Sequence, residues 1–268
     1  MQYRTLKVFF DAQGVLRVVL SRPEIRNAFD SIMISELTEV FTTDALKSEV
    51  RAVVLSGEGS TFCAGGDLNW MRQGAQSSYE ENLQDTRKLT QMFAALNECP
   101  KLVLGAVQGA AIGGGVGLVS VCDVVIAVAN TQFSLSEVRL GIVPACIGPF
   151  VISKIGASHS RALFMSAERF EAHRAQEVGL VHRVVADVSL LEPAVKETLK
   201  NILQCSPNAL SVAKRLVLDL SWPERRSQFP DCLEYVAKTL ADLRVSKEGQ
   251  EGVCAFLEKR RPSWFGHE

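Results

Sequence analysis

The chain has 268 residues, of which 47% are hydrophobic, so it can bury a large core without disulfides or metals. Its 29 basic and 30 acidic side chains give no electrostatic reason to expect nucleic acid or an anionic membrane as a partner. The seven cysteines form no C-x-x-C pairs, which argues against a disulfide framework or a zinc site. A polar N-terminus and the lack of a long uncharged apolar run predict a soluble, cytoplasmic protein.

The first part of the chain alternates between strand and helix patterns. Val15–Leu20 is a β-branched run that ends shortly before Pro23, which predicts a strand followed by a turn. Apolar residues at spacings of three and four predict a helix from Ser31, and Arg51–Leu55 is typical of a second buried strand. We expect the polar and glycine-containing segment Thr61–Gly74 to be a loop.

The next elements continue this order and then give way to helices alone. A helix is predicted by the apolar spacing of Leu89, Met92, Phe93 and Leu96, and Pro100 ends it. Leu102–Val107 and Val124–Val128 are the following predicted strands. From about residue 190 only helical patterns occur. The sequence therefore predicts an α/β core over residues 1–190 and an α-helical region over residues 191–268.

Two glycine-rich segments, Phe62–Leu68 and Gly109–Gly117, each follow a predicted strand. Glycine lets bare backbone approach a ligand, and N–H groups left free at a turn or at the first turn of a helix point outward as donors. Two such donors aimed at one point form an oxyanion hole, in which one donor is worth a factor of about 10² to 10³ in rate. Taken alone, Gly113–Gly115 is equally compatible with tight packing of a helix against a strand.

Motifs along nearly the whole chain resemble the enoyl-CoA hydratases of the crotonase superfamily. The matching segments follow the family patterns F-x-AG-x-D, AVNG-x-x-x-GGG, L-x-RP-x-x-RNA, F-x-x-x-E-x-x-LGI-x-P and F-x-EKR-x-P-x-W, and lie at Phe62–Asp67, Ala106–Gly115, Leu20–Ala28, Phe133–Pro144 and Phe256–Trp264. The resemblance implies a crotonase-like α/β spiral of ββα units. It also implies C-terminal helices that assemble a homotrimer or a hexamer built as a dimer of trimers.

The same resemblance implies where an acyl-coenzyme A substrate binds. The oxyanion donors fall on the N–H groups of Gly66 and Gly114, and the acid/base residue falls on Glu137. Coenzyme A is part of the substrate, so no separate cofactor or metal is required. The implied acyl-CoA contacts are Ile25, Arg26, Ala64, Asp67, Leu68, Asn69, Phe256 and Lys259, the last two from a neighbouring subunit. Asp67 is as well suited to capping the following turn as to touching a ligand.

One position departs from the family pattern. The best-known hydratases hold water with two glutamates, whereas the first of these positions is Gly117 here and only Glu137 remains. A lone glutamate in an apolar pocket has a raised pKa and can move one proton between neighbouring carbons. That behaviour suits an isomerase that moves a β,γ double bond into conjugation, and it also suits a hydratase that recruits its second function elsewhere.

The segments Ser136–Phe150 and Ser166–Val181 most resemble 3-methylglutaconyl-CoA hydratases and related carboxylated-enoyl-CoA hydratases of bacterial leucine and terpenoid breakdown. We therefore place hydration of a branched or carboxylated 2-enoyl-CoA first, with double-bond isomerisation as the alternative. A non-catalytic acyl-CoA-binding or RNA-binding protein is the third hypothesis, which the balanced charge disfavours. A carboxylated substrate needs a cation near the acyl group, and Arg72 and Arg139 are the candidates.

Overall fold

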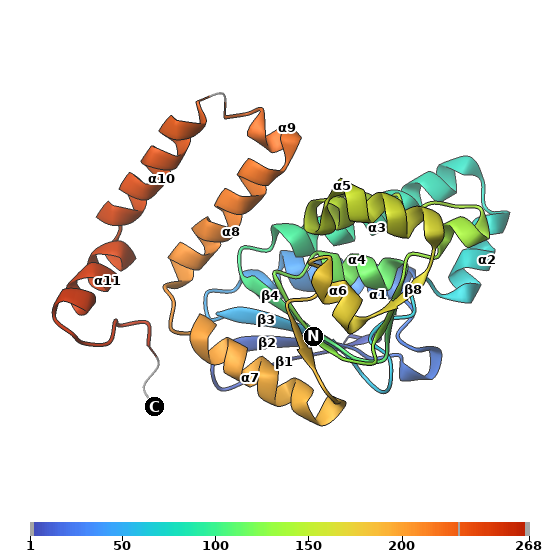
Figure 1. Ribbon diagram of the computed structural model, residues 1–268, viewed down its shortest axis with the longest axis horizontal. Coiled ribbons are helices and arrows are strands. Elements are labelled where there is room, and N and C mark those ends of the chain that lie inside the picture. Colours follow the sequence, from blue (N-terminus) through green and yellow to red (C-terminus); the bar gives the residue numbers. More distant parts are fainter. Residues whose placement is uncertain (1–2, 230, 266–268) are drawn as a thin grey trace.

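A six-stranded sheet organises the first part of the computed structural model, which describes residues 3–229 and 231–265 (Figure 1). Residues 266–268, the end of the expected helical region, lie outside this description. The strand order is β1-β2-β3-β4-β6-β9; β1 pairs antiparallel with β2, and every other pairing is parallel. The strands are β1 (Leu6–Phe10), β2 (Val15–Leu20), β3 (Ala52–Gly57), β4 (Leu102–Val107), β6 (Val124–Val128) and β9 (Arg183–Val185).

A second, smaller sheet lies beside the first and positions the glycine-rich segments. It contains β5 (Ala110–Ile112), β7 (Gln132–Ser134) and β8 (Arg169–Glu171), with β7 in the middle. Two isolated parallel bridges, Cys63 to Ala111 and Phe29 to Gly66, extend this pairing to segments that are not regular strands. The two sheets confirm the expected α/β fold.

Helices cover both faces of the large sheet (Figure 1). The main hydrophobic core lies between one face and α1, α3, α4, α5 and α6, whereas Leu191, Val195 and Leu199 of α7 pack on the other face. The helices of this part are α1 (Ser31–Thr42), α2 (Leu68–Gln76), α3 (Tyr79–Glu98), α4 (Gly114–Ser120), α5 (Gly148–Ser166), α6 (Ala172–Glu177) and α7 (Leu191–Ile202), with short 3-10 helices η1 (Pro23–Ile25), η2 (Asp44–Leu46), η3 (Glu137–Leu140) and η4 (Val188–Leu190).

The last four helices extend away from the sheet and form a C-terminal arm (Figure 1). They are α8 (Pro207–Ser221), α9 (Pro223–Arg226), α10 (Cys232–Val245) and α11 (Lys247–Leu257). An ion pair of 2.8 Å between Lys214 and Asp123 fixes α8 to the core. The buried carboxylate of Asp219 accepts hydrogen bonds from Arg215, Arg225 and Tyr235, which ties three arm helices together.

The sequence predicted most of these elements, including the helix at Ser31 and the strands over Val15–Leu20, Leu102–Val107 and Val124–Val128. The expected loop over Thr61–Gly74 was wrong in its second half, because α2 begins at Leu68. No helix among the described residues is long and apolar enough to cross a membrane. Nor do the described His, Cys, Asp and Glu side chains form a group that could hold a metal ion.

Asp67 explains where α2 begins. Its carboxylate accepts hydrogen bonds from the backbone N–H groups of Asn69 and Trp70, and so satisfies donors that the first helical turn leaves free. Arg22 pairs with the same carboxylate at 3.0 Å and donates to the carbonyl of Ala28. Burial alone raises the pKa of Asp67, but these two backbone donors and Arg22 outweigh it and lower the pKa.

We expect Asp67→Ala to lower the free energy of unfolding by about 1–2 kcal/mol, because α2 loses its cap and Arg22 loses a partner. Asp67→Asn keeps an acceptor oxygen and should lose less. The advantage of aspartate over asparagine is present above its unfolded-state pKa and disappears as the pH falls through its lowered folded-state pKa. Urea denaturation of both variants at neutral and acidic pH measures this; equal losses in both variants would contradict it.

Candidate active site

The two glycine-rich segments run side by side. Cys63 donates to the carbonyl of Ala110 at 3.1 Å and accepts from the N–H of Ile112 at 3.0 Å. Gly65, at φ +92°, comes so close that a Cβ added to it would lie 2.8 Å from the Ile112 oxygen and 3.9 Å from the Gly114 nitrogen. The fold therefore brings the two segments together, as the sequence predicted.

The N–H of Gly66 is free within the described part of the chain. Its neighbours bond to Phe29: the Gly65 carbonyl accepts from Phe29 N–H, and the Asp67 N–H donates to the Phe29 carbonyl, both at 2.9 Å. In a parallel pairing of this kind the residue between two bonded neighbours directs its own N–H to the opposite side. For Gly66 that side faces the segment of Ala110–Ile112, to which Cys63 is bonded.

Gly114 supplies a second free donor because it is the first residue of α4, and nothing in the described chain caps that end. Its N–H belongs to the first turn, where the helix dipole is positive. The glycines here are also required by packing. A Cβ at Gly114 would lie 2.3 Å from Phe29 Cζ, and one at Gly115 would lie 2.4 Å from the Cys63 oxygen. The packing interpretation of the glycine run is therefore confirmed, and the oxyanion role of Gly114 stays a prediction that its N–H at the helix start is compatible with.

Glu137 lies directly beside this helix start. It is the first residue of η3, which follows β7, and a Cβ added at Gly113 would lie 3.0 Å from Glu137 Oε1. The other carboxylate oxygen, Oε2, is buried and has no hydrogen-bond partner in the described structure. Burial raises the pKa of the Glu137 carboxyl, although a hydrogen bond from its own backbone N–H lowers it in part. An unpaired carboxyl of this kind is suited to holding or releasing a proton.

Gly117 stands at the first of the two positions where the best-known hydratases have a glutamate. In this structure the apolar side chains of Ile147 and Phe93 occupy the space beside it. A Cβ at Gly117 would lie 2.3 Å from Ile147 Cγ2 and 2.8 Å from Phe93 Cε1. Both side chains are buried, with exposed fractions of 3% for Ile147 and 0% for Phe93. A larger residue at this position is therefore excluded unless the surrounding helices change.

The side chains next to the free N–H groups are apolar. A Cβ at Gly66 would lie 3.5 Å from Trp70 Cζ3 and 3.5 Å from Met71 Cγ. Phe29 packs against Trp70 with ring centroids 6.1 Å apart. Sequence reasoning missed Phe29, Trp70, Phe93 and Ile147, because nothing local marks a hydrophobic residue as a neighbour of a distant glycine.

Several of the expected coenzyme A contacts lie near these groups. The carbonyl of Arg26 accepts from the N–H of Ala64 at 3.0 Å, which places the Ile25–Arg26 loop beside the Gly66 segment. Leu68 and Asn69 begin α2 and are exposed. Asp67, by contrast, is buried and engaged as a cap and ion-pair partner.

Phe256 and Lys259 are not brought to this site within one chain. Phe256 lies on α11 and is 81% exposed, and Lys259 follows the helix in an exposed position with φ +55°. The arm that carries them lies at the opposite end of the molecule from α2 (Figure 1). Within one chain these two side chains are therefore not brought to the Gly66 segment, and their contact with coenzyme A from a neighbouring subunit stays a prediction.

Arg72 and Arg139, the candidate cations for a carboxylated substrate, are both exposed. Arg72 donates to Asn69 Oδ1 at 3.3 Å, on the same helix. Arg139 is two residues from Glu137 in η3. Arg72 thus lies on the helix that follows Gly66, and Arg139 lies on the short helix that Glu137 begins.

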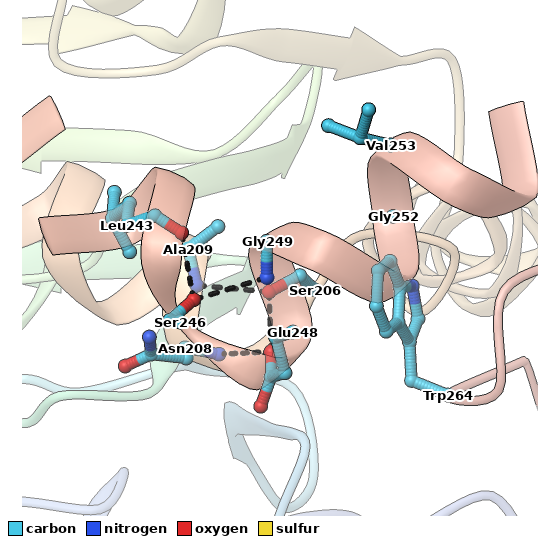
Figure 2. Close-up of a pocket in the computed structure, with 10 residues that line it drawn as sticks. All are labelled: Ser206, Asn208, Ala209, Leu243, Ser246, Glu248, Gly249, Gly252, Val253 and Trp264. Atoms are coloured by element: carbon cyan, nitrogen blue, oxygen red, sulfur yellow. Dashed lines mark hydrogen bonds between the residues drawn. The ribbon is translucent and has the colours of Figure 1, made fainter. Parts of the chain in front are cut away.

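A cavity of about 260 Å³ lies elsewhere, in the C-terminal arm between α8, α11 and Trp264 (Figure 2). Its polar groups are engaged in mutual capping: Glu248 accepts from Ser206 Oγ and from the Asn208 N–H, while Ser246 Oγ accepts from Gly249. These bonds join the ends of two helices. The cavity shares no lining residue with the segments around Gly66, Gly114 and Glu137.

We expect Glu137→Gln to raise the free energy of unfolding near neutral pH, because an amide removes a partly desolvated charge with an unpaired oxygen. The folded-state pKa is raised, so the cost of ionisation is fully present above it and vanishes as the pH falls below the unfolded-state pKa. Urea denaturation at neutral pH and in mild acid tests this, with the exposed Glu168→Gln as control. A gain that does not shrink in acid would contradict it.

Comparison with known proteins places these features in a family. Residues 11–267 match the family model described as enoyl-CoA hydratase/isomerase. The chain is 36% identical over 248 residues to the enoyl-CoA hydratase AKT6-1 of Alternaria alternata, covering 92% of this chain and 80% of that protein. It is 33% identical over 261 residues to the 2,3-dehydroadipyl-CoA hydratase of Escherichia coli, covering 95% and 96% of the two chains. It spans 66% of a second Alternaria alternata hydratase, ACTT6, at 34% identity.

Solved structures agree with the sequence matches. The crystal structure of an enoyl-CoA hydratase from Shewanella pealeana superposes with a TM-score of 0.91 at 36% identity, over 98% of this chain and 97% of that one. Pseudomonas aeruginosa AtuE gives the same TM-score at 37% identity, over 98% and 100% of the chains. Family model, relatives and fold all agree, and the chain belongs to the enoyl-CoA hydratase/isomerase (crotonase) family of enzymes.

Proposed function

We propose that this protein is an enoyl-CoA hydratase, which adds water across the 2,3 double bond of an acyl-coenzyme A thioester. One observation carries the proposal: two backbone donors without a partner in the described chain, Gly66 and Gly114, lie on adjoining segments, and the Glu137 carboxyl, whose Oε2 has no partner there either, lies beside Gly113. The relatives named as enoyl-CoA hydratases support the choice of reaction.

The two N–H groups act on the thioester oxygen. Hydrogen bonds from Gly66 and Gly114 stabilise the negative charge that this oxygen carries when the substrate becomes an enolate. Because both donors are backbone groups fixed by packing, they need little reorganisation during the reaction. Withdrawal of electrons toward the oxygen makes C3 electrophilic and any proton on C2 acidic. Phe29, Trp70 and Met71 surround the site with hydrocarbon, and a less polar environment strengthens the hydrogen bonds.

Glu137 handles both protons of the hydration. In its neutral form it gives the proton on one carboxyl oxygen to C2, while the water oxygen bonds to C3 and the proton released from water moves to the other carboxyl oxygen. The carboxyl is then neutral again, so one side chain completes the addition. The raised pKa keeps a larger fraction of Glu137 in this neutral form.

Isomerisation is the second candidate, favoured by the packing at Gly117. Ile147 and Phe93 leave no room for a second carboxylate to hold water there. An ionised Glu137 can instead remove a proton from C2 of a 3-enoyl-CoA and return it to C4, which moves the double bond into conjugation without any water.

The acyl group of the substrate and the assembly of several chains are two finer parts of the proposed function. We propose a branched or carboxylated acyl group such as that of 3-methylglutaconyl-CoA, with Ile25, Arg26, Ala64, Leu68 and Asn69 along the acyl-CoA path. The relative named as a 2,3-dehydroadipyl-CoA hydratase supports this substrate class. In a trimer or hexamer formed by the arm, a neighbouring chain supplies Phe256 and Lys259 to the coenzyme A end; their exposure supports this.

We expect Glu137→Gln to lower kcat for crotonyl-CoA hydration by a factor of about 10² to 10⁴, since the amide cannot relay the protons. The KM should change little, because the oxyanion donors are untouched. Loss of conjugated-thioester absorbance measures hydration, and its gain with a 3-enoyl-CoA measures isomerisation. A wild-type protein that is inactive on every enoyl-CoA tested, or a variant with undiminished kcat, would overturn the proposed function.

The pH dependence separates the two reactions. Hydration through neutral Glu137 should fall as the pH rises through its raised pKa, whereas isomerisation through ionised Glu137 should rise over the same range. Profiles of kcat/KM against pH measure the fall with crotonyl-CoA, which reports hydration, and the rise with a 3-enoyl-CoA, which reports isomerisation. Parallel profiles for the two substrates would mean that one protonation state serves both and would contradict this assignment.

For a carboxylated substrate we expect Arg72→Ala or Arg139→Ala to raise the KM for 3-methylglutaconyl-CoA by about tenfold, the value of one lost charged hydrogen bond. The KM for crotonyl-CoA, which has no distal carboxylate, should stay nearly constant. Arg87→Ala, an exposed change on α3, is the control. Equal effects on both substrates would exclude these arginines as the carboxylate partners.

A further inference from the structure

The N-terminal end of α4 lies beside Glu137. Gly113 is the N-cap of α4, and the N–H of Gly117 donates to its carbonyl at 3.2 Å, so Gly117 lies one helical turn beyond Gly113. Glu137 Oε1 lies over Gly113. In an α-helix each Cα–Cβ bond tilts toward the N-terminus, so a side chain at residue 117 would extend toward Gly113 and the Glu137 carboxyl.

Ile147 and Phe93 occupy that space from two other helices. Phe93 comes from α3, and Ile147 is the residue immediately before α5. With contacts of 2.3 Å and 2.8 Å to the Cβ position at Gly117, they overlap any side chain there. The Phe93 ring packs against Phe150 at 6.1 Å, and Phe150 packs against Trp222 at 5.6 Å, so a row of aromatic rings supports this side of the space.

We infer that Phe93 and Ile147 are specificity-determining residues, which keep this site a one-carboxylate site by excluding any side chain at position 117. The inference rests on the proposed function for its chemical meaning, although its steric part stands on the packing alone. With hydrocarbon at this position, no second acid/base group can fix a water molecule against Glu137. The same wall leaves proton transfer by Glu137 alone unhindered, so hydration and isomerisation both have to proceed through this one carboxyl.

The steric part is tested by a double-mutant cycle on stability. Gly117→Ala should destabilise the wild-type protein, because its new methyl group overlaps Ile147, and should destabilise the Ile147→Ala background much less. Ile126→Ala is the matched control, since Ile126 is equally buried but packs with α7 on the other face of the sheet. Gly117→Ala and Ile126→Ala should be additive. Additivity of Gly117→Ala with Ile147→Ala as well would overturn the inference.

The chemical part is tested by restoring the carboxylate. Gly117→Glu alone should unfold at a lower temperature and lose activity on both substrates. Gly117→Glu with Ile147→Ala should raise kcat/KM for crotonyl-CoA hydration by about 10²-fold over Ile147→Ala, the contribution of one positioned acid/base group. Gly117→Gln with Ile147→Ala is the uncharged control and should show no gain. Addition of Phe93→Leu provides more room if the double variant does not fold.

The outcomes separate this inference from the proposed function. If the wild type is inactive on all enoyl-CoA substrates, the proposed function fails, and the stability cycle still decides the steric claim. If the wild type is active and Gly117→Glu alone gains hydration activity without loss of stability, the inference fails and the proposed function survives. A gain by the Glu and Gln double variants alike would also overturn it, because the effect would then be the cavity and not the carboxylate.

Discussion

The close approach of the first turn of α4 to Cys63 and Phe29 is the constraint on which this site depends. The Cβ position of Gly115 lies 2.4 Å from the Cys63 carbonyl oxygen, and that of Gly114 lies 2.3 Å from the Phe29 ring. Any side chain at either position would push the helix away and separate the Gly114 N–H from the Gly66 segment. Glycine has no side chain, and this allows the close contact. For the same reason, the backbone N–H of Gly114 is left uncovered.

The arrangement carries a local cost in stability at Glu137. A carboxyl that is buried, with Oε2 unpaired, is less stable in its ionised form than a carboxyl in water. Nearby Asp67 is also buried, yet it has two backbone donors and Arg22, and its pKa is lowered. The two acidic side chains therefore lie in different electrostatic environments: Asp67 is fixed at the start of α2, and Glu137 beside Gly113 keeps a raised pKa that suits the proposed proton transfer.

The sequence was sufficient for the strands, most helices and the pairing of the two glycine-rich segments, because strand periodicity and glycine clusters are local signals. It was also sufficient to place Glu137 near Gly114 through the family motif. It was insufficient for the start of α2, since the capping role of Asp67 competes with a ligand-binding role that has the same residue type. Phe93 and Ile147 were beyond reach, because Gly117 meets them through contacts across 24 and 30 positions of the chain.

Gly117 illustrates why an absent residue has to be interpreted through its neighbours. From the sequence, its lack of a side chain means only that no residue is present there to hold or deprotonate a water molecule. In the fold, that place is closed by one side chain from α3 and one at the start of α5. The number of acid/base groups in this site is therefore set jointly by three helices, and a change from glycine to glutamate requires compensating changes in the other two. Core packing from α3 and from the start of α5 thus limits which side chains can lie one helical turn from Gly113 and its neighbour Glu137.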